Sequence, residues 1–414
     1  MLLYHIRLTE AMTMKKIKFG VIGLGHRGKG LLKVILMNMP TVEVTAVCDL
    51  YEDRVQEGID IVKKASGNAV YGTTDALELI NRPDVEAVFI YSAWESHIPL
   101  SIECMKASKP VGVEVGGAYS VEQCWELVHT YEKTGTPIML LENCCYDRRE
   151  LMVLNMVRQG LFGEIVHCEG GYCHDLRDEI SEGEQNRHYR LRNYLARNCE
   201  NYPTHELGPI AKVLDINRGN RFVKLASFAS KSAGLNEYIN ANMPENDKLK
   251  NAHFAQGDVV TTVITCAGGQ TIRLTLDTTL PRYYSRQFTV RGTKGMYEEV
   301  TDSVYLDGDG KHFKWKEEWG NGKTYAEKYD HEIWKKYLSD GVQGGHGGID
   351  WLVMNDFVDS LIEKRPCPID VYDMASWMCV TALSENSISL GGAPVDFPDF
   401  TNGAWLLNKF SDCN

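Results

Sequence analysis

A glycine-rich turn that follows the first long apolar run constrains the fold of this chain more than any other feature. The run Ile17–Ile22 leads into Gly23-Leu24-Gly25-His26-Arg27-Gly28. Glycines in this Gly-x-Gly-x-x-Gly pattern allow a tight turn and let backbone N–H groups at a helix N-terminus approach a pyrophosphate. The next apolar run, Val42–Cys48, ends at Asp49, where a carboxylate can bind ribose hydroxyls and repel a 2′-phosphate. The pattern therefore predicts a dinucleotide site that prefers NAD to NADP.

Apolar runs and helical patterns alternate through the first third of the chain. We expect further strands at Val85–Tyr91, Pro110–Val115 and Pro137–Leu141, and helices at Leu31–Met39, Glu52–Ala65, His97–Ala107 and Val121–Lys133. Strands that alternate with helices of this length predict right-handed crossovers and a doubly wound parallel sheet. We assign residues 15–145 to a Rossmann NAD-binding domain, and we expect residues 1–13 to be a loose extension.

The alternation of strands and helices stops after Asn143. Beyond it, the sequence predicts strands with few helices between them. These strands are Glu164–Gly171, Phe222–Ser230, Val259–Ala267, Thr271–Leu280 and Gln287–Arg291. Two of them flank Ala267-Gly268-Gly269-Gln270, which is typical of a hairpin turn. Near the end, Trp351, Met354 and Val358 recur at helical spacing after a run of glycines around His346. We assign residues 146–414 to an α+β domain with a mixed, mostly antiparallel open sheet that binds substrate and forms oligomers.

Composition excludes several classes of protein. No run of about 18 apolar residues is present, so we expect no membrane-spanning helix. The net charge of −12 argues against binding to a nucleic-acid backbone. Twelve cysteines without a Cys-x-x-Cys motif favour a reduced, metal-free cytoplasmic protein. The first residues lack the pattern of a signal peptide, although a misassigned start would leave a periplasmic location open.

Polar and aromatic residues also follow the later predicted strands. Tyr91–His97, Glu114-Val115 and Asn143 each stand where a strand ends. In a doubly wound sheet these carboxyl ends form the ligand-binding edge. Taken singly, Trp94 and His97 are best explained as a core residue and a capping residue. Their shared position at strand ends favours a functional role as well, so both interpretations stay open.

Taken together, these motifs resemble the Gfo/Idh/MocA family and, more closely, glycoside hydrolase family 109, the NAD-dependent α-N-acetylgalactosaminidases. The resemblance spans nearly the whole chain from Lys15. The motifs that carry it are Gly25-His26-Arg27-Gly28, Trp94–His97, Glu114-Val115, Tyr202-Pro203-Thr204-His205 with Leu207-Gly208-Pro209, Tyr284-Ser285-Arg286 and Gly344-Gly345-His346-Gly347-Gly348.

Carried over by position, the resemblance implies two sets of contacts. Beside the glycines Gly23, Gly25 and Gly28, the cofactor contacts would be His26, Arg27, Asp49, Trp94, His97, Glu114, Val115 and Asn143. The sugar contacts would be Tyr172, Arg190, Tyr202, Pro203, Thr204, His205 and Tyr284, and we place His346 near the sugar as well. Two positions depart from the pattern: Val115 stands where ordinary dehydrogenases of the wider family have a catalytic Lys, and Glu206 stands where the hydrolases typically have Gly.

The resemblance implies a glycosidase that uses tightly bound, recycled NAD. Oxidation at sugar C3 would acidify the C2 proton, the aglycone would leave by elimination, water would add at C1, and the hydride would return to C3. We expect His205 to remove a proton at C3 or C2, Tyr202 to assist the leaving group or the C2 proton, Tyr284 to take part in proton transfer, and Arg190 to orient the sugar.

Three alternatives stay open at this point. An NAD-dependent sugar oxidoreductase would release a keto-sugar and NADH. A non-catalytic protein would only sense NAD or a sugar. At the level of the motif, Tyr202-Pro203-Thr204-His205 could be a turn whose Thr204 caps a helix that begins near Leu207. The second domain's open sheet face also predicts a homo-oligomer.

Overall fold

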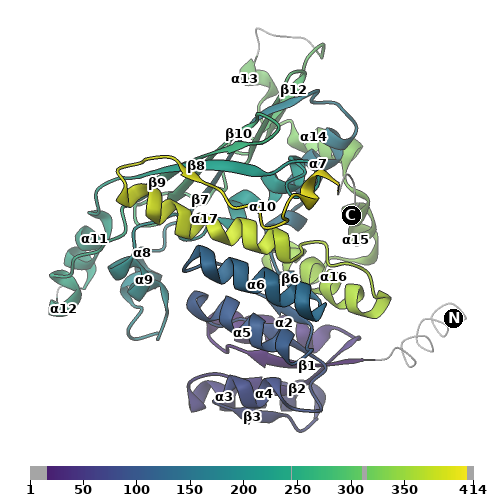
Figure 1. The fold of residues 1–414 in the computed structure, drawn as a ribbon, viewed down its shortest axis with the longest axis vertical. Helices are drawn as coiled ribbons and strands as arrows, with labels where there is room; N and C mark the ends of the chain where they lie inside the picture. Colours follow the sequence, from purple (N-terminus) through teal and green to yellow (C-terminus); the bar gives the residue numbers. More distant parts are fainter. Residues whose placement is uncertain (1–15, 244, 310–314, 408–414) are drawn as a thin grey trace, which may run out of the picture.

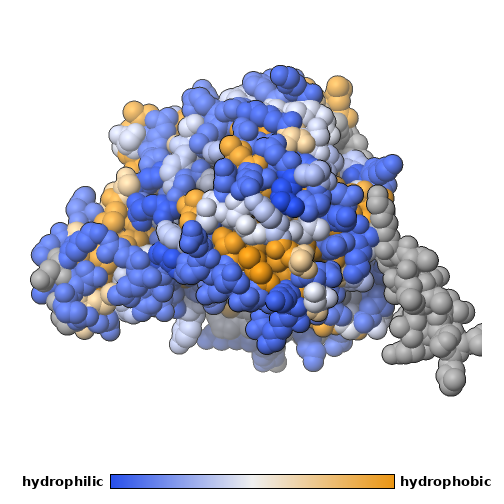
Figure 2. Space-filling model, turned by 90° about the horizontal axis from the view of Figure 1, so that it is seen from below, coloured by the Kyte–Doolittle hydropathy of each residue, from blue (hydrophilic) through white to orange (hydrophobic). Residues whose placement is uncertain are grey.

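Two sheets, one above the other, organise the molecule (Figure 1). The computed structural model describes residues 16–243, 245–309 and 315–407, so the extension predicted for residues 1–13 lies outside the described residues. Within the described ranges, no helix has the length and apolarity needed to cross a membrane. Seen from below, the surface is mostly hydrophilic, with an apolar area near the centre and smaller ones toward the edges (Figure 2).

The smaller sheet contains six strands in the order β3-β2-β1-β4-β5-β6, all parallel, as the sequence predicts. The order reverses between β1 and β4, and this switch point is where doubly wound sheets bind ligands. The strands are β1 (Ile17–Ile22), β2 (Val42–Cys48), β3 (Tyr71–Thr73), β4 (Ala87–Ile90), β5 (Val111–Val113) and β6 (Ile138–Leu140). The helices are α2 (His26–Val34), α3 (Glu52–Ser66), α4 (Ala76–Ile80), α5 (Trp94–Lys106) and α6 (Val121–Thr134), with a 3₁₀ turn at Leu36–Asn38.

Two details of this sheet differ from the prediction. The first helix begins at His26 and not at Leu31, because the glycine-rich segment itself forms its first turn. The short elements β3 and α4 were not predicted, since three and five residues are too few to show a period.

The larger sheet contains eight strands in the order β13-β12-β11-β7-β10-β9-β8-β14. Only the pair β7 and β10 is parallel, which confirms the mixed, mostly antiparallel sheet. The strands are β7 (Ile165–Cys173), β8 (Phe222–Ala229), β9 (Val259–Cys266), β10 (Thr271–Asp277), β11 (Thr289–Gly292), β12 (Gly295–Glu298), β13 (Ser303–Leu306) and β14 (Val395–Asp396). The predicted hairpin joins β9 to β10 through Gly269, whose φ of 88° suits glycine.

The expectation of few helices in this half is wrong. Before β9 the structure has α7 (Arg148–Arg158), α8 (Arg177–Ser181), α9 (Arg190–Ala196), α10 (Thr204–Val213), α11 (Gly234–Asn242) and α12 (Asp247–Lys250). After β13 it has α13 (Trp315–Glu318), α14 (Gly322–Tyr329), α15 (Glu332–Asp340), α16 (Ile349–Glu363) and α17 (Val371–Ser389), with 3₁₀ turns at His346–Gly348 and Ala404–Leu406. A further 3₁₀ turn, Asn143–Tyr146, lies between β6 and α7. Of these, α16 matches the predicted helix. In α10, Gly208 and Pro209 hide the helical period.

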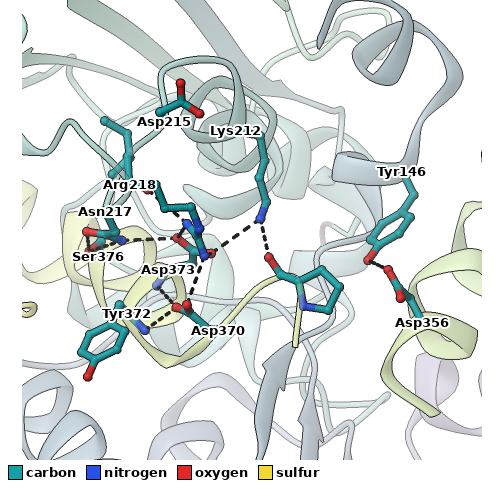
Figure 3. A network of polar contacts seen from close by, with 12 residues as sticks. Tyr146, Lys212, Asp215, Asn217, Arg218, Asp356, Asp370, Tyr372, Asp373 and Ser376 are labelled. Carbon is teal, nitrogen blue, oxygen red and sulfur yellow. Dashed lines mark hydrogen bonds and ion pairs between the residues drawn. The ribbon is translucent and has the colours of Figure 1, made fainter. Parts of the chain in front are cut away.

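A buried ion cluster fastens α10 to α17 (Figure 3). Asp373, in the first turn of α17, accepts two hydrogen bonds of 2.7 Å from the guanidinium of Arg218. The ammonium of Lys212, near the end of α10, lies 3.6 Å from the same carboxylate. Burial raises the pKa of Asp373, but the two cations outweigh burial and hold this pKa below its usual value. The carboxylate is therefore charged, and α10 is anchored at the end opposite Thr204.

We expect Asp373→Ala to lower the free energy of unfolding by about 3 kcal/mol, because the largely buried cations of Arg218 and Lys212 would lose their closest carboxylate and keep partners such as Asp370 and the Pro368 carbonyl. Urea unfolding measures this change. Asp396→Ala is the matched control, since the pair of Asp396 with Lys224 is exposed, and it should leave stability unchanged. If the Asp373→Ala variant unfolded at the same urea concentration as the parent protein, the anchoring role of Asp373 would be contradicted.

Candidate active site at the carboxyl ends of the parallel strands

The glycine-rich turn leaves a hollow at the N-terminus of α2. A Cβ on Gly23 would lie 2.4 Å from the Ser92 backbone nitrogen, and one on Gly28 would lie 2.0 Å from the Gly23 oxygen, so both positions exclude a side chain. Gly25 differs, because the nearest atom to a Cβ there is Nη1 of Arg54, at 3.7 Å. No side chain caps this end of α2. The N-terminus of α2 is therefore left without a side-chain cap and with room at Gly25, an arrangement that suits a pyrophosphate.

Asp49 completes the dinucleotide site at the end of β2. Its buried carboxylate accepts hydrogen bonds from the backbone nitrogen of Leu24 at 2.7 Å and from that of Tyr51 at 3.1 Å. Nη1 of Arg54 lies 3.8 Å from the same group. A carboxylate held beside the glycine-rich turn is placed to receive ribose hydroxyls. The residues present therefore fit NAD in two ways. The turn at Gly25 leaves room for the pyrophosphate, and Asp49 at the end of β2 can bind the ribose hydroxyls.

Arg27 stands at the centre of a polar network that crosses between the two sheets. Its guanidinium donates to Glu114 at 3.0 Å and to both oxygens of Asp350 at 2.7 and 2.8 Å. Asn143 donates to Asp350 at 2.7 Å, and Nδ1 of His346 lies 2.7 Å from the other oxygen of that carboxylate. The network brings together Arg27, Glu114 and Asn143, three of the residues carried over as cofactor contacts.

Asp350 itself was missed by the sequence reasoning, although it is the second residue of α16, directly after the glycine-rich run. The side chain of His346 is mostly exposed and lies against Arg27 and Asp350. Its contacts are therefore on the cofactor side, and the sugar contact expected for it stays a prediction.

The loop after β4 places Trp94 and His97 at the start of α5. The buried His97 ring contacts the Ser92 carbonyl at 2.9 Å, and burial lowers its pKa to about 4 against that hydrogen bond. The neutral ring therefore fixes the loop. Trp94 Nε1 is buried beside Gly116 and has no hydrogen-bond partner among the described residues. Val115 is buried after β5 and offers no titratable group in place of the absent Lys.

Aromatic and imidazole rings from three elements form a continuous wall beside Trp94. The Tyr202 ring centroid lies 5.5 Å from Trp94, 4.4 Å from Tyr172 and 4.9 Å from His205. The wall continues through His174, which was not predicted to contact sugar, to Tyr284 at a centroid distance of 5.1 Å. Tyr172, Tyr202, His205 and Tyr284, scattered over 113 positions (284 − 172 + 1), are thus brought together.

Arg190 covers one end of this wall. The guanidinium carbon lies 4.9 Å from the Trp94 ring centroid and 5.0 Å from that of Tyr202. Its Nε is 2.7 Å from a carboxylate oxygen of Glu179, while Nη1 is buried with no partner among the described residues. A buried donor next to aromatic rings is suited to a hydroxyl or amide oxygen of a sugar.

His205 is oriented by Glu142, a residue that sequence reasoning missed. Its Nδ1 lies 2.6 Å from Oε1 of the fully buried Glu142, which also accepts the Cys144 backbone N–H at 3.0 Å. Burial raises the pKa of Glu142, but His205 and further hydrogen bonds outweigh burial and hold this pKa below its usual value. A charged carboxylate fixes the proton on Nδ1, so Nε2 carries the lone pair and faces the Tyr202 hydroxyl at 3.4 Å.

The helix boundary tests the capping alternative for the Tyr-Pro-Thr-His segment. The helix α10 begins at Thr204 itself, after Pro203, and no side chain caps it. The alternative in which Thr204 caps a helix near Leu207 is therefore wrong. Instead, Tyr202 just before α10 and His205 in its first turn have their rings in contact.

Two further groups of titratable residues lie close by. Glu206, the departure noted in the sequence, is buried against Glu200, and burial raises the pKa of both carboxyls, that of Glu200 to about 7. Potential metal ligands in the described ranges meet at Glu142, Cys144 and His205, within 4.8 Å of one another. A metal-free site stays a prediction.

Two family models match this chain. The model described as "Glycosyl hydrolase 109, C-terminal domain" matches residues 146–407, and "Oxidoreductase family, NAD-binding Rossmann fold" matches residues 17–141.

Curated relatives are similar over nearly the full length. A glycosyl hydrolase family 109 protein of Parabacteroides distasonis is 40% identical over 94% of this chain and 88% of its own. An alpha-N-acetylgalactosaminidase of Tannerella forsythia is 39% identical over 94% of this chain and 87% of its own.

Solved structures share the fold at low identity. An NAD-binding oxidoreductase from Klebsiella pneumoniae superposes with a TM-score of 0.67 at 16% identity, covering 93% of this chain and 99% of that one. The myo-inositol dehydrogenase of Lactobacillus casei, in complex with NAD(H) and myo-inositol, gives 0.62 at 14% identity, with 93% and 97% covered. These likenesses confirm the predicted combination of folds.

We expect Gly25→Ala to weaken NAD binding by roughly tenfold or more, because the new methyl group would occupy the space that lets the backbone approach a pyrophosphate. Gly25 has φ −64°, so alanine is tolerated there and the protein should fold normally. Isothermal titration with NAD measures the change. Gly30→Ala, in the same helix with open space around its Cβ position, is the control and should bind NAD as the parent does. Equal affinities for the two variants would argue against a dinucleotide at this turn.

Proposed function

Because the chain belongs to the glycosyl hydrolase 109 family, with the Gfo/Idh/MocA dinucleotide-binding fold at its N-terminus, we propose that it cleaves α-N-acetylgalactosaminides or α-glycosides of a closely related sugar. The cleavage is redox-neutral and uses NAD that is held tightly and recycled. The observation that carries this proposal is the chain of contacts from Glu142 through His205 to Tyr202, whose ring packs against Trp94 at the start of α5.

The cofactor would be held by the hollow at Gly25, by Asp49, and by the network of Arg27, Glu114 and Asn143. When bound, NAD⁺ supplies a hydride acceptor that makes a transient ketone at sugar C3 and afterwards returns the hydride. The ketone makes the C2 proton acidic, so a neutral imidazole is a sufficient base. The residues of the chain then need only position the sugar and move protons.

His205 is the base in this proposal. With the proton of Nδ1 fixed by Glu142, its Nε2 is the acceptor, and it faces the wall of tyrosines where a sugar would lie. As Nε2 gains a proton, the buried carboxylate of Glu142 stabilises the imidazolium that forms. The same Nε2 can later return the proton to C2.

The tyrosines act as acids and hydrogen-bond donors. Burial raises the pKa of Tyr172 to about 12 against the opposing charge of Arg190, and it raises that of Tyr202 well above the usual value. Both phenols are therefore protonated at neutral pH. Tyr202, adjacent to His205, is positioned to donate to the departing oxygen, while Tyr172, Tyr284 and Arg190 hold the sugar hydroxyls or the acetamido oxygen.

An NAD-dependent sugar oxidoreductase is the second candidate, because the structures that share this fold include dehydrogenases. The buried Val115 argues against it, since it stands where the wider family has its catalytic Lys. An oxidoreductase would also have to exchange its cofactor after every turnover, whereas a redox-neutral glycosidase does not.

We also propose that the protein is a homo-oligomer. One face of the larger sheet packs against α10 and α17. Phe228 and Val263 are exposed on the other face, where His167, Glu169 and Arg273 offer polar pairs around them. A second copy of the chain would cover this apolar surface.

The direct test of the function combines two signals from one reaction. Purified protein is mixed with an aryl α-N-acetylgalactosaminide, and aglycone release is followed together with NADH absorbance. We expect aglycone to accumulate with no net NADH. NADH that rises in step with substrate consumption would establish the oxidoreductase instead, and no signal in either channel would contradict the choice of sugar.

The Glu142–His205 contact generates a second prediction. Glu142→Gln should lower kcat by about 10²–10⁴-fold, because a neutral amide no longer fixes the Nδ1 proton or stabilises the imidazolium. His205→Ala should abolish turnover. Glu169→Gln, on the exposed sheet face, serves as the control and should keep the parental rate. Parental turnover by a folded Glu142→Gln variant would show that His205 works without this carboxylate.

A further inference from the structure

The segment between α8 and α9 belongs to the second sheet's half of the chain but contacts the dinucleotide domain. Arg187 makes two parallel hydrogen bonds with Asp53, in the first turn of α3, at 3.0 and 2.6 Å. Its guanidinium also lies over the Tyr51 ring, 4.2 Å from the centroid. Both partners follow Asp49 within four residues, so the contact is made next to the ribose-binding position.

A second contact joins the same two parts of the chain. The Asn186 carbonyl accepts a hydrogen bond of 2.8 Å from Nη2 of Arg54. The other nitrogen of this guanidinium, Nη1, is 3.8 Å from Asp49 and is the nearest atom to the open side of Gly25. Asn186 is therefore bonded to a side chain that lines the hollow where the cofactor would lie.

The following residues continue along the site toward the sugar end. The rings of His188 and Tyr189 stack at 4.5 Å, and Tyr189 lies 4.8 Å from Trp94. Arg190 then covers Trp94 and Tyr202. Consecutive residues from Asn186 to Arg190 thus run from the acidic end of the dinucleotide site to the aromatic wall.

The backbone of this segment has an unfavourable conformation at Arg187. Arg187 has a φ of 52°, in the left-handed region that non-glycine residues rarely adopt. The turn is closed by the hydrogen bond from the His188 nitrogen to the Gly183 oxygen at 2.8 Å. A long side chain in such a conformation is maintained by its surroundings, and here those surroundings are Asp53 and Tyr51.

We propose that residues 186–190 form a strap that retains the dinucleotide between turnovers. This inference rests on the proposed use of NAD and adds the residues that retain it. A dinucleotide lying between the glycine-rich turn and the strap leaves only when the contacts of Arg187 and Arg54 break. A redox-neutral enzyme gains from such retention, because each turnover regenerates the oxidised cofactor in place.

The rate of NAD dissociation tests the strap without any sugar. Protein loaded with NAD is diluted into an excess of a fluorescent etheno-NAD, and the exchange is followed by fluorescence. Arg187→Asp and Asp53→Arg each place like charges face to face and should speed NAD release by about fivefold or more. The double exchange, Asp53→Arg with Arg187→Asp, restores opposite charges and should bring the rate back toward that of the parent.

Arg177→Ala is the matched control for Arg187→Ala. Arg177 makes the same kind of two-bond pair, with Asp175 at 2.8 and 2.7 Å, and lies over the Tyr238 ring at 5.0 Å, but both partners are on its own side of the site. Only Arg187→Ala should release NAD faster. Arg187→Lys, which keeps the charge but loses the paired geometry, should give an intermediate rate.

The strap proposal would be overturned if folded Arg187→Asp and Arg187→Ala variants released NAD at the rate of the parent protein. It would also be overturned if the double exchange released NAD faster than either single variant. Thermal unfolding of each variant identifies those that fail to fold, and Arg187→Lys then decides the question. If the parent binds no NAD, the cofactor proposal falls together with the strap. If the parent retains NAD but cleaves no glycoside, only the proposed reaction fails.

Discussion

The hydrogen bond between Glu142 and His205 is the contact on which the proposed chemistry depends. It joins the end of the last parallel strand to the first turn of α10, and so it couples the dinucleotide sheet to the wall of tyrosines. Because the carboxylate is fully buried, its charge is tolerated only while a partner faces it. The bond therefore sets the tautomer of the base and also fixes the position of α10 relative to the cofactor edge.

Other buried carboxylates repeat this arrangement. Asp350 in α16 binds Arg27 and Asn143 from the dinucleotide domain, and Asp373 in α17 binds Arg218 and approaches Lys212 beyond the end of β6. Each carboxylate lies near the N-terminus of a helix, and each pairs with a cation from a distant part of the chain. Removing either partner would leave a buried charge, which makes the relative placement of the elements specific. The site is assembled from both halves and does not exist in either alone.

The parts of this structure that the sequence predicts are those whose signal is local. The turn from Gly23 to Gly28 and the carboxylate of Asp49 lie in one unit of strand, helix and strand, where spacing alone defines the geometry. The catalytic assignments of Tyr202 and His205 came from a resemblance, and the structure adds that their rings meet. Glu142, Asp350 and Arg187 were missed because their partners lie 63, 323 and 134 positions away, and nothing in the local pattern separates them from ordinary surface acids and bases. The α10 helix was anticipated only in the capping alternative, with a start near Leu207, because Gly208 and Pro209 interrupt its period.

The most direct test of the central claim is the fate of the C2 hydrogen during cleavage. The reaction is run in deuterium oxide, and the released sugar is examined by NMR at C2. A cleavage that proceeds through oxidation at C3 and proton removal by His205 predicts deuterium at C2 in the product, with no net NADH formed. A product that keeps its original hydrogen at C2 while aglycone is released would contradict the account, because the glycosidic bond would then break without the proton transfer for which Glu142 and His205 are arranged.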